Sequence, residues 1–389
     1  MIEKFKNIVY DWQQKRILNS FRKGHAAEIA SMCQSAGITL EKCYGEDAWL
    51  KKWQPLMPNV NIDSYRFYAQ FIGNDPNIVP DDLYHGIIEP LLCDKTSLPV
   101  YLNKNLYEKV MGVDMFPVCV LRNMRGDYMT RDYRDMKMTE SLFEKMVTNN
   151  ERLKQQGRMI IKPAVETGRG KGVRLFVYDG KEWISNDKKK LTLEWLNKTY
   201  SHDFIIQECI EPSDFVKQFN PTSYSTCRLF TYRSVVNGEM IFIGGLLRIG
   251  KIGNFKDNVS TGGFAIPILK NGELANFATN ESRKKFTKVN DIDLGKAVFS
   301  IPNFPQILDM VFHAADMTPL NRILSFDVIL DKNNLPHIIE FNLKCQTITT
   351  IQSSYKTLFG EYTDEVIEYC KRKIEKGQTG IIPVYLSRS

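Results

Sequence analysis

A series of short, apolar, β-rich runs after about residue 99 constrains this chain most. Runs of β-branched and aromatic residues bounded by turn residues predict strands. Several consecutive runs are separated by hairpin-length turns such as Asn271-Gly272, which join antiparallel neighbours. We therefore expect an α+β architecture with largely antiparallel sheet. The runs are 118–121, 159–161, 173–177, 204–206, 227–232, 240–247, 323–330 and 337–341.

The first hundred residues have a different pattern. From Ile2 to about Trp53, apolar residues recur at three- and four-residue spacing, which predicts helices. Thr39, followed by Glu41 and Lys42, resembles a further helix start. We expect a mixed or helical N-terminal domain over 1–98. Near the other end, 361–376 has the pattern of an amphipathic closing helix.

Composition excludes several classes of protein. Of the 389 residues, 43% are hydrophobic and 25% are charged, which is close to the globular average and excludes a disordered, collagen-like or coiled-coil chain. The 52 basic and 45 acidic residues give a net charge of +7. A surplus this small suits anionic small molecules or an anionic membrane surface, and no nucleic-acid partner is expected.

Cysteine, histidine and hydropathy patterns favour an intracellular setting. The cysteines include no CxxC pair and no zinc-type spacing with histidine, so we expect buried thiols in a reducing compartment. There is no apolar run typical of a signal peptide or a transmembrane segment, which predicts a cytoplasmic location. The histidines are expected to be structural. These residues are Cys33, Cys43, Cys93, Cys119, Cys209, Cys227, Cys345 and Cys370, with His25, His85, His202, His313 and His337.

A glycine-rich segment follows the strand that ends in Lys162-Pro163. It contains three glycines in five positions with two cations between them. The backbone N–H groups of such a loop can approach phosphate oxygens closely, which predicts a phosphate-binding lid between two strands. An ordinary glycine-rich hairpin is an equally good interpretation of the loop taken alone, and a Walker loop is absent. The segment comprises Gly168, Arg169, Gly170, Lys171 and Gly172.

Two late apolar runs flank Asn333-Asn334. If they pair as an antiparallel hairpin around these asparagines, Asp327 lies opposite Glu340, and Asn342 shares the face of Glu340. Opposed carboxylates repel unless a cation lies between them, and ligation by oxygen alone suits Mg²⁺ with nucleotide phosphates. The alternative is a solvated hairpin whose acidic residues lie on its solvent-exposed face.

Two arginines lie within apolar runs in the intervening sequence, Arg228 after Thr226-Cys227 and Arg248 after Leu246-Leu247. A lone arginine on a strand is usually a surface ion-pair partner. Two of them inside apolar runs are better explained as ligands for an anionic group. The segment from Asp257 to Gly263 is either a second ligand-binding loop or an ordinary turn.

The ordered set of these motifs resembles the ATP-grasp superfamily over roughly residues 100 to 375. The motifs that carry this resemblance are Lys162 before the glycine-rich loop, Gln207-Glu208-Cys209-Ile210 ending a strand, and Asp327 followed by Glu340-Phe341-Asn342. The motifs at 225–228, 247–250, 257–258 and 262–263 resemble the sugar-transfer-associated branch, which is found with polysaccharide biosynthesis. The resemblance implies two α+β subdomains whose antiparallel sheets clamp ATP, 99–206 and 207–389, preceded by the domain 1–98.

The resemblance also assigns roles to individual residues. Lys104 and Lys162 would contact the ATP phosphates, and Gly168, Gly170, Lys171 and Gly172 would cover them. Gln207, Glu208, Cys209 and Ile210 would hold adenine, and Asp214 or Glu211 the ribose. Asp327, Glu340 and Asn342 would bind Mg²⁺, as two ions. Arg228 and Arg248, with Lys162, would be catalytic near the γ-phosphate and the acyl intermediate.

The implied activity is ATP-dependent ligation of a carboxylate to an amine through an acyl phosphate, with ADP and phosphate released. The partners would be a small-molecule carboxylate and an amine or sugar acceptor. An ATP-grasp phosphotransferase acting on a hydroxyl, and a non-catalytic ATP-binding scaffold of a glycosyltransfer complex, are the alternatives. Many relatives have a Pro-Gly turn after the ExN motif, whereas Leu343-Lys344-Cys345 follows Asn342 here, which leaves the acceptor side open. The sequence does not determine substrates or oligomeric state.

Overall fold

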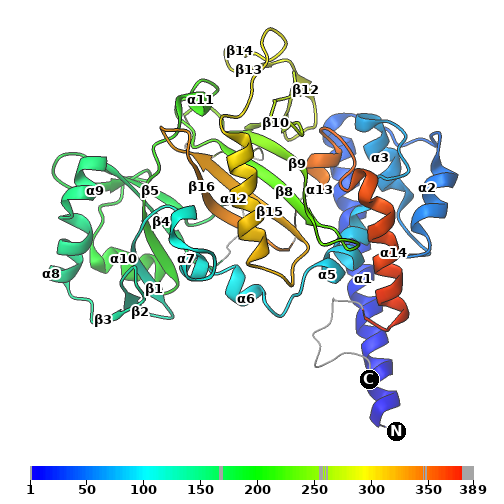
Figure 1. Cartoon of the computed structure of the whole chain (residues 1–389), viewed down its shortest axis with the longest axis horizontal. Coiled ribbons are helices and arrows are strands. Elements are labelled where there is room, and N and C mark those ends of the chain that lie inside the picture. The colour runs from blue at the N-terminus through cyan, green and yellow to red at the C-terminus, as the bar shows by residue number, and fades with distance from the viewer. Residues whose placement is uncertain are drawn as a thin grey trace. The chain divides into compact units, whose positions relative to one another are not determined.

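Two compact units make up the chain in the computed structural model, which describes residues 2–165, 170–253, 257, 259, 262–344, 346 and 348–378 (Figure 1). Unit 1 comprises Met1–Leu98, Phe215–Asp327 and Phe341–Ser389. Unit 2 comprises Pro99–Asp214 and Val328–Glu340. The chain therefore enters each unit more than once, and the hairpin predicted around Asn333-Asn334 contributes residues to both.

Unit 1 begins with helices. They are α1 (Ile2–Ala36), α2 (Glu46–Trp53), α3 (Ile62–Ile72), α4 (Asp81–Leu83), the π-helix η1 (Tyr84–Ile88) and α5 (Glu89–Leu92). The prediction of a helix start at Thr39 is wrong. Gly37, with φ 69°, ends α1, and the next helix begins only after Gly45, with φ 89°. Both glycines adopt the left-handed backbone conformation that interrupts a right-handed helix.

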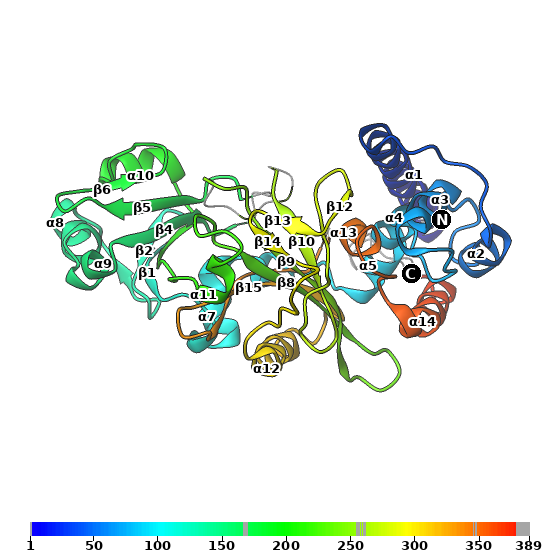
Figure 2. The same ribbon diagram turned by 90° about the horizontal axis from the view of Figure 1, so that it is seen from above.

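A seven-stranded sheet in the order β12-β11-β10-β9-β8-β15-β16 lies mostly in unit 1, while residues 328–330 of β15 and 336–340 of β16 belong to unit 2. Its strands are β8 (Thr226–Arg233), β9 (Met240–Ile249), β10 (Phe264–Ile268), β11 (Ala278–Thr279), β12 (Lys285–Phe286), β15 (Ile323–Leu330) and β16 (Pro336–Asn342). The helix α12 (Phe304–Asp316) lies along this sheet beside β8 (Figures 1 and 2). A short ribbon, β13 (Lys288–Val289) with β14 (Ile292–Asp293), lies apart from it.

The N-terminal helices share one hydrophobic core with later elements of unit 1. Trp49, Tyr65 and Tyr84 pack in the same buried cluster as Tyr232 of β8 and Val366 of α14. The cluster also includes residues of α13 (Ile348–Gln352), while α14 spans Thr363–Glu375, as the closing helix was predicted to do. Burial of this apolar surface is the main force that holds the first 98 residues to the sheet. The division into 1–98, 99–206 and 207–389 stays a prediction.

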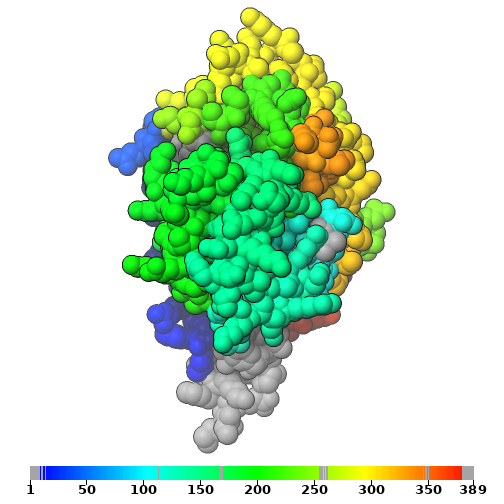
Figure 3. Space-filling model, turned by 90° about the vertical axis from the view of Figure 1, so that its left-hand side faces the viewer, coloured from blue at the N-terminus to red at the C-terminus, as the bar shows by residue number. Residues whose placement is uncertain are grey.

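Unit 2 is built on a second seven-stranded sheet, in the order β3-β2-β1-β7-β4-β5-β6. Its strands are β1 (Cys119–Met124), β2 (Asp127–Met129), β3 (Asp135–Met136), β4 (Arg158–Pro163), β5 (Arg174–Tyr178), β6 (Trp183–Ser185) and β7 (Phe204–Glu208). Its helical elements are α6 (Leu98–Tyr101), η2 (Lys104–Leu106), α7 (Tyr107–Met111), η3 (Val113–Met115), α8 (Glu140–Phe143), η4 (Glu144–Thr148), α9 (Glu151–Gln156) and α10 (Leu193–Tyr200). The short helix α11 (Asp214–Lys217) begins at Asp214 of unit 2, and its other residues belong to unit 1. The teal atoms of α8 and α9 and the green atoms of α10 form part of the face shown in Figure 3.

The predicted strands and fold class are confirmed. Each of the eight apolar runs forms a strand, namely β1, β4, β5, β7, β8, β9, β15 and β16. The strand pairs with a defined register are antiparallel. Seven of the eight cysteines lie in the described part as free thiols, five of them buried, while Cys345 lies outside it. Within the described residues, no helix combines the length and apolar character that a membrane span requires.

Candidate functional site

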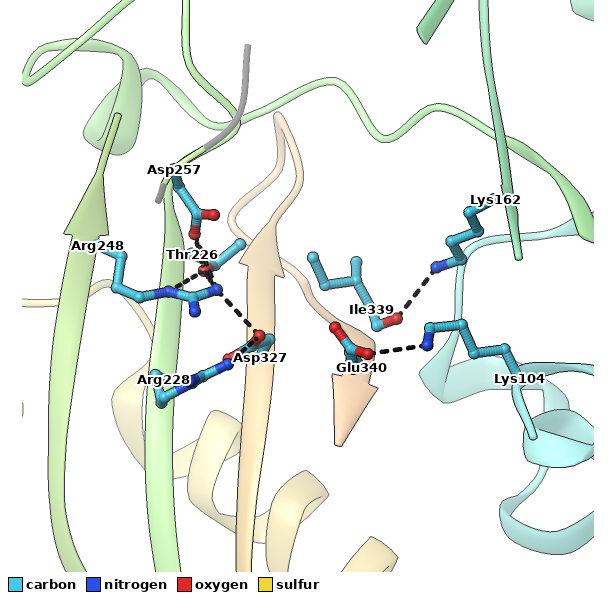
Figure 4. Close-up of polar contacts among 9 residues, drawn as sticks. All are labelled: Lys104, Lys162, Thr226, Arg228, Arg248, Asp257, Asp327, Ile339 and Glu340. Carbon is cyan, nitrogen blue, oxygen red and sulfur yellow. Dashed lines mark hydrogen bonds and ion pairs between the residues drawn. The ribbon is translucent and has the colours of Figure 1, made fainter. Parts of the chain in front are cut away.

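Two lysines and a glutamate form a lysine cluster in unit 2. Lys104 Nζ lies 2.8 Å from Glu340 Oε1, and Lys162 Nζ donates a hydrogen bond to the Ile339 carbonyl at 3.1 Å (Figure 4). The two lysines are 9% and 8% exposed, whereas the Glu340 side chain is 32% exposed. Residues 58 positions apart in the sequence, Lys104 and Lys162, therefore bring their ammonium groups to the same short stretch of β16.

Local structure explains why both lysines are held firmly. Lys162 is the fifth residue of β4, which is paired on one side with β5 and on the other with β7. The Lys104 backbone N–H donates to the Ala164 carbonyl at 2.8 Å, immediately after β4. Asn103 caps η2 through a hydrogen bond from the Asn105 N–H to its side chain. Both lysines are thus fixed to the end of one strand.

Burial makes the lysine cluster electrostatically unusual. Removal from water, followed by repulsion from Lys104, lowers the pKa of Lys162 to about 8, and Glu340 offsets only part of this effect. A bound anion would reverse the shift, because it stabilises the charged form of a buried ammonium group. Two ammonium groups against a single carboxylate leave the cluster suited to phosphate.

The glycine-rich segment joins β4 to β5. Gly168 lies outside the described residues, so the structure describes the predicted lid only from Gly170 onward. Lys171 is exposed. Gly172 has a φ of 80°, and a Cβ there would lie 2.8 Å from Pro163 Cγ. No larger residue fits this backbone without displacing the proline next to Lys162.

The residues predicted to hold adenine lie at the end of β7, the central strand of the unit 2 sheet. Gln207 Nε2 donates to the Pro117 carbonyl at 3.0 Å. The Glu208 carboxylate accepts from Gln156 Nε2 at 2.8 Å and lies 2.8 Å from Arg152 Nε. Both side chains are therefore engaged in interactions within unit 2. Of the remaining predicted residues, Cys209 and Ile210 are half-buried, and Asp214 is the first residue of α11.

The two predicted arginines meet a carboxylate in unit 1, and we name this group the arginine cluster. Arg228 holds Asp327 in a bidentate pair, with Nε and one terminal nitrogen each 2.8 Å from a carboxylate oxygen. Arg248 adds a third hydrogen bond to Asp327 at 2.9 Å (Figure 4). It also lies 3.0 Å from Asp257 and donates to Thr226 Oγ1 at 2.8 Å. Thr226 in turn donates to Asp257.

Strand register builds the arginine cluster. Thr226 of β8 pairs directly with Arg248 of β9, and Arg228 follows two residues later on the same face of β8. The strand β15, which carries Asp327, is the neighbour of β8 in the sheet. Three adjacent strands thus converge on one carboxylate. The sequence indicated the arginines but gave no sign that Asp327 would be their partner.

The two carboxyl groups of the arginine cluster have opposite pKa shifts. Burial disfavours ionisation of Asp327, but Arg228 and Arg248 outweigh it and lower its pKa to about 2. Burial raises the pKa of Asp257 above its ordinary value, and Arg248 opposes this only in part. Asp327 therefore carries a full negative charge at neutral pH.

The predicted metal ligands divide between the units. Asp327 and Asn342 belong to unit 1, and Glu340 belongs to unit 2. The Asn342 side chain is half-buried, and its Nδ2 has no hydrogen-bond partner within the described part of the chain. Across the described ranges, no three His, Cys, Asp or Glu side chains are grouped as a metal site. The ligand set therefore stays a prediction.

Sequence reasoning missed several residues that support these clusters. Arg152 and Gln156 of α9 hold Glu208 across more than 50 residues of sequence, and no local motif marks them. Tyr200 donates to the Gly172 carbonyl at the end of the glycine-rich segment, and Arg174 donates to the Tyr200 hydroxyl. The one available signal was the position of Arg174 at the start of the strand that follows the glycines.

Antiparallel sheets, a glycine-rich connection after a buried lysine, and an Asp…Glu-x-Asn hairpin are typical of ATP-grasp proteins. A family model described as sugar-transfer associated ATP-grasp matches residues 92–364, which is more than half of the chain. The chain therefore belongs to the sugar-transfer-associated ATP-grasp family and has the ATP-grasp fold. No curated protein sequence matches it.

Several solved structures are similar to the chain. They include an ADP complex of N5-carboxyaminoimidazole ribonucleotide synthetase (10% identity, TM-score 0.38, covering 70% of this chain and 52% of that one). The ATP-grasp ligase PsnB complexed with a minimal precursor has 10% identity and a TM-score of 0.37, with 71% and 63% coverage. L-amino acid ligase from Bacillus licheniformis has 11% identity and a TM-score of 0.34, with 70% and 52% coverage. The chain thus spans about half to two thirds of the length of these ligases, and the likeness carries no information on substrate.

Proposed function

We propose that the protein is an ATP- and Mg²⁺-dependent carboxylate–amine ligase that forms an acyl phosphate and releases ADP and phosphate. The observation that carries the proposal is the pairing of cations with carboxylates in two places, the buried Lys104 with Glu340 and the two half-buried arginines with Asp327. Each carboxylate is the counterion of cations of the kind that bind phosphate in an ATP-dependent enzyme.

The family description supports the choice of pathway. Sugar-transfer-associated members suggest that the product is an amino acid joined to a sugar or small acid during surface-polysaccharide assembly. The proposed partners are a small-molecule carboxylate and an amine or sugar acceptor. We propose that this chemistry takes place in the cytoplasm, where ATP is available.

The donor chemistry of the chain fits Mg²⁺. Asp327, Glu340 and Asn342 offer only oxygen ligands of the kind that Mg²⁺ prefers, and the low pKa of Asp327 keeps that ligand ionised at neutral pH. We propose that these three side chains hold the metal, which arrives with the nucleotide. When bound, Mg²⁺ neutralises negative charge on the phosphates. The cations that now pair with Asp327 and Glu340 would then be free to turn toward phosphate oxygens.

The proposed reaction requires positioning and charge stabilisation rather than a protein nucleophile. An oxygen of the substrate carboxylate attacks the γ-phosphorus, and the bond from this phosphorus to the β–γ bridging oxygen breaks, which releases ADP. The amine then attacks the acyl carbon, loses a proton and expels inorganic phosphate, leaving an amide. Lys104 and Lys162 would bind the transferring phosphates, and Arg228 and Arg248 would stabilise the charge that develops on them.

A paired-substrate screen tests the proposal. Amino acids and uronic acids are offered in pairs with Mg·ATP, ADP release is measured, and products are identified by mass spectrometry. A product whose mass equals that of the two substrates together less one water contains the expected amide and supports the ligase. ADP release with a phosphorylated acceptor identifies a phosphotransferase instead.

Calorimetry with Mg·ATP tests the alternative of a non-catalytic scaffold. The purified chain is expected to bind Mg·ATP, and the variant Lys162→Ala is expected to bind it more weakly. Absence of binding by the unmodified chain would overturn the ligase proposal, whereas binding without ADP release from any substrate pair would favour the ATP-binding scaffold. The thermal unfolding of both proteins is the control, because a variant that has lost its fold carries no information about the site.

A further inference from the structure

The Tyr200 hydroxyl lies in unit 2, at the end of the β4–β5 hairpin where the glycine-rich connection joins the two strands. Tyr200 is the last residue of α10, and its hydroxyl donates a hydrogen bond to the Gly172 carbonyl at 2.7 Å. The Ile161 carbonyl lies 3.4 Å from the same oxygen. Arg174 donates to this hydroxyl at 3.2 Å. One hydroxyl thus contacts the backbone on both sides of the glycine-rich connection.

The two carbonyl groups flank the part of the hairpin that the proposed function uses. Ile161 immediately precedes Lys162, and Gly172 is the last glycine of the connection. Ile161 also pairs with Arg174 across β4 and β5, so the hydroxyl lies at the last registered pair of the two strands. Beyond that pair β4 stays paired with β7, whereas on the β5 side no registered pair includes Gly172 in the described part of the chain, and the Tyr200 hydroxyl supplies a contact to the backbone there.

Tyr200 is itself held in place. The Arg174 guanidinium lies over the rings of Trp195 and Tyr200, 5.4 and 5.7 Å from their centres, and donates to Asp187 at 3.1 Å. An arginine that lies over two aromatic rings and is tied to a carboxylate loses much of its conformational freedom. Burial raises the pKa of Tyr200 above its ordinary value, so the hydroxyl stays protonated and can donate.

We propose that Tyr200, supported by Arg174, is a positioning residue that prepares the end of the β4–β5 hairpin for the nucleotide phosphates. The inference rests on the proposed function, because it assumes that Lys162 and the glycine-rich connection meet ATP. Without the hydroxyl, the backbone around Gly172 samples more conformations, and the bound state must restrict them. Affinity is then reduced by the free energy of that restriction.

The test compares two tyrosine-to-phenylalanine variants by calorimetry with Mg·ATP. Tyr200→Phe removes the hydroxyl but keeps the ring. Tyr128→Phe is the matched control, because the Tyr128 hydroxyl donates to Asn197 of the same helix α10 at 2.6 Å, away from the glycine-rich connection. A hydrogen bond contributes about 0.5 to 1.5 kcal/mol, which corresponds to a change in Kd of about 2- to 13-fold. We expect Kd to rise by this factor in Tyr200→Phe and to stay unchanged in Tyr128→Phe.

Hydrogen exchange and thermal unfolding distinguish positioning from general stability. In the nucleotide-free protein, the Val173 amide, which donates to the Gly170 carbonyl at 3.3 Å, should exchange faster in Tyr200→Phe than in Tyr128→Phe. If both variants lose similar thermal stability and neither changes Kd, the hydroxyl is only structural and the inference is wrong. If the unmodified chain binds no Mg·ATP, the proposed function fails first and the inference falls with it.

Discussion

The affinity of the protein for Mg·ATP should fall about tenfold between pH 7 and pH 9. The cause is Lys162, whose pKa burial and Lys104 lower to about 8 in the nucleotide-free protein. A bound triphosphate stabilises the protonated lysine, so binding at high pH requires that a proton be taken up. The perturbation is a change of pH alone, which leaves every side chain in place.

The magnitude follows from the titration of a single group. With a pKa of about 8, Lys162 is protonated in roughly nine-tenths of molecules at pH 7 and one-tenth at pH 9. Only the protonated fraction binds with full affinity, so the apparent Kd is divided by that fraction and rises about tenfold. Calorimetry or a fluorescent nucleotide displacement assay, repeated at half-unit steps of pH and constant ionic strength, measures it.

The stability of the protein without nucleotide should change with pH in the opposite direction: it should rise between pH 7 and pH 9, while the affinity for Mg·ATP falls. Lys162 has an ordinary pKa of 10.5 in the unfolded chain and about 8 in the folded one, so the unfolded state binds more protons above pH 8. The free energy of unfolding therefore rises with pH, by roughly 1 kcal/mol between pH 7 and 9 from this residue. Denaturant titration in the absence of nucleotide checks this sign. A loss of affinity caused by general unfolding would show a loss of stability instead.

Two variants identify the group responsible. Lys162→Ala should weaken binding by about 1.5 to 3 kcal/mol at pH 7, the range for a hydrogen bond to a charged group, and should abolish the pH dependence. Lys356, whose pKa burial and Lys270 also lower to about 8, lies in unit 1 and is not among the predicted site residues. Lys356→Met should therefore keep the tenfold fall. A flat profile in the unmodified protein, or one that Lys356→Met removes, would refute the reasoning.

Three further outcomes follow from the described contacts. Glu340→Gln should remove Mg²⁺-dependent turnover, and retained full activity would contradict the metal role. Circular dichroism should show an intact fold, because the substitution removes only the charge that pairs with Lys104. Thr226→Val should lower the free energy of unfolding by about 1 to 3 kcal/mol in urea, because it leaves buried charged partners without the hydroxyl they share; an unchanged midpoint would be inconsistent with the network. Gly172→Ala should raise the Kd for Mg·ATP and lower thermal stability, since the added Cβ would meet the ring of Pro163 in a left-handed backbone; normal binding would show that the backbone can adapt.

Local sequence pattern predicted the secondary structure well because the strands are apolar over most of their length. The runs at 323–330 and 337–341 became β15 and β16, and every residue of β15 is buried. The error at Thr39 has a local cause as well, since two glycines in left-handed conformation decide where α1 ends and α2 begins. Turn geometry of that kind depends on backbone angles that composition does not fix.

The candidate site could be predicted only in part. Residue type and order were sufficient to select Lys162, Arg228, Arg248 and Asp327, since charged groups inside or at the end of apolar runs need a reason to be there, and the family resemblance added Lys104. Their partners were not predictable. Arg228 meets Asp327 across 99 positions of sequence, and such a contact depends on which strands become neighbours in the sheet.

The sequence by itself determined which segments are strands, where the glycine-rich connection lies and which family the chain resembles, because periodicity and residue chemistry are local properties. The tertiary structure decided which charges are neighbours, and through burial it set the pKa values of Lys162 and Asp327 in the folded protein. It also joined the first 98 residues to the core of unit 1 and placed Tyr200 at the end of the β4–β5 hairpin. Burial and through-space electrostatics depend on distances between residues remote in sequence, and only the folded chain fixes those distances.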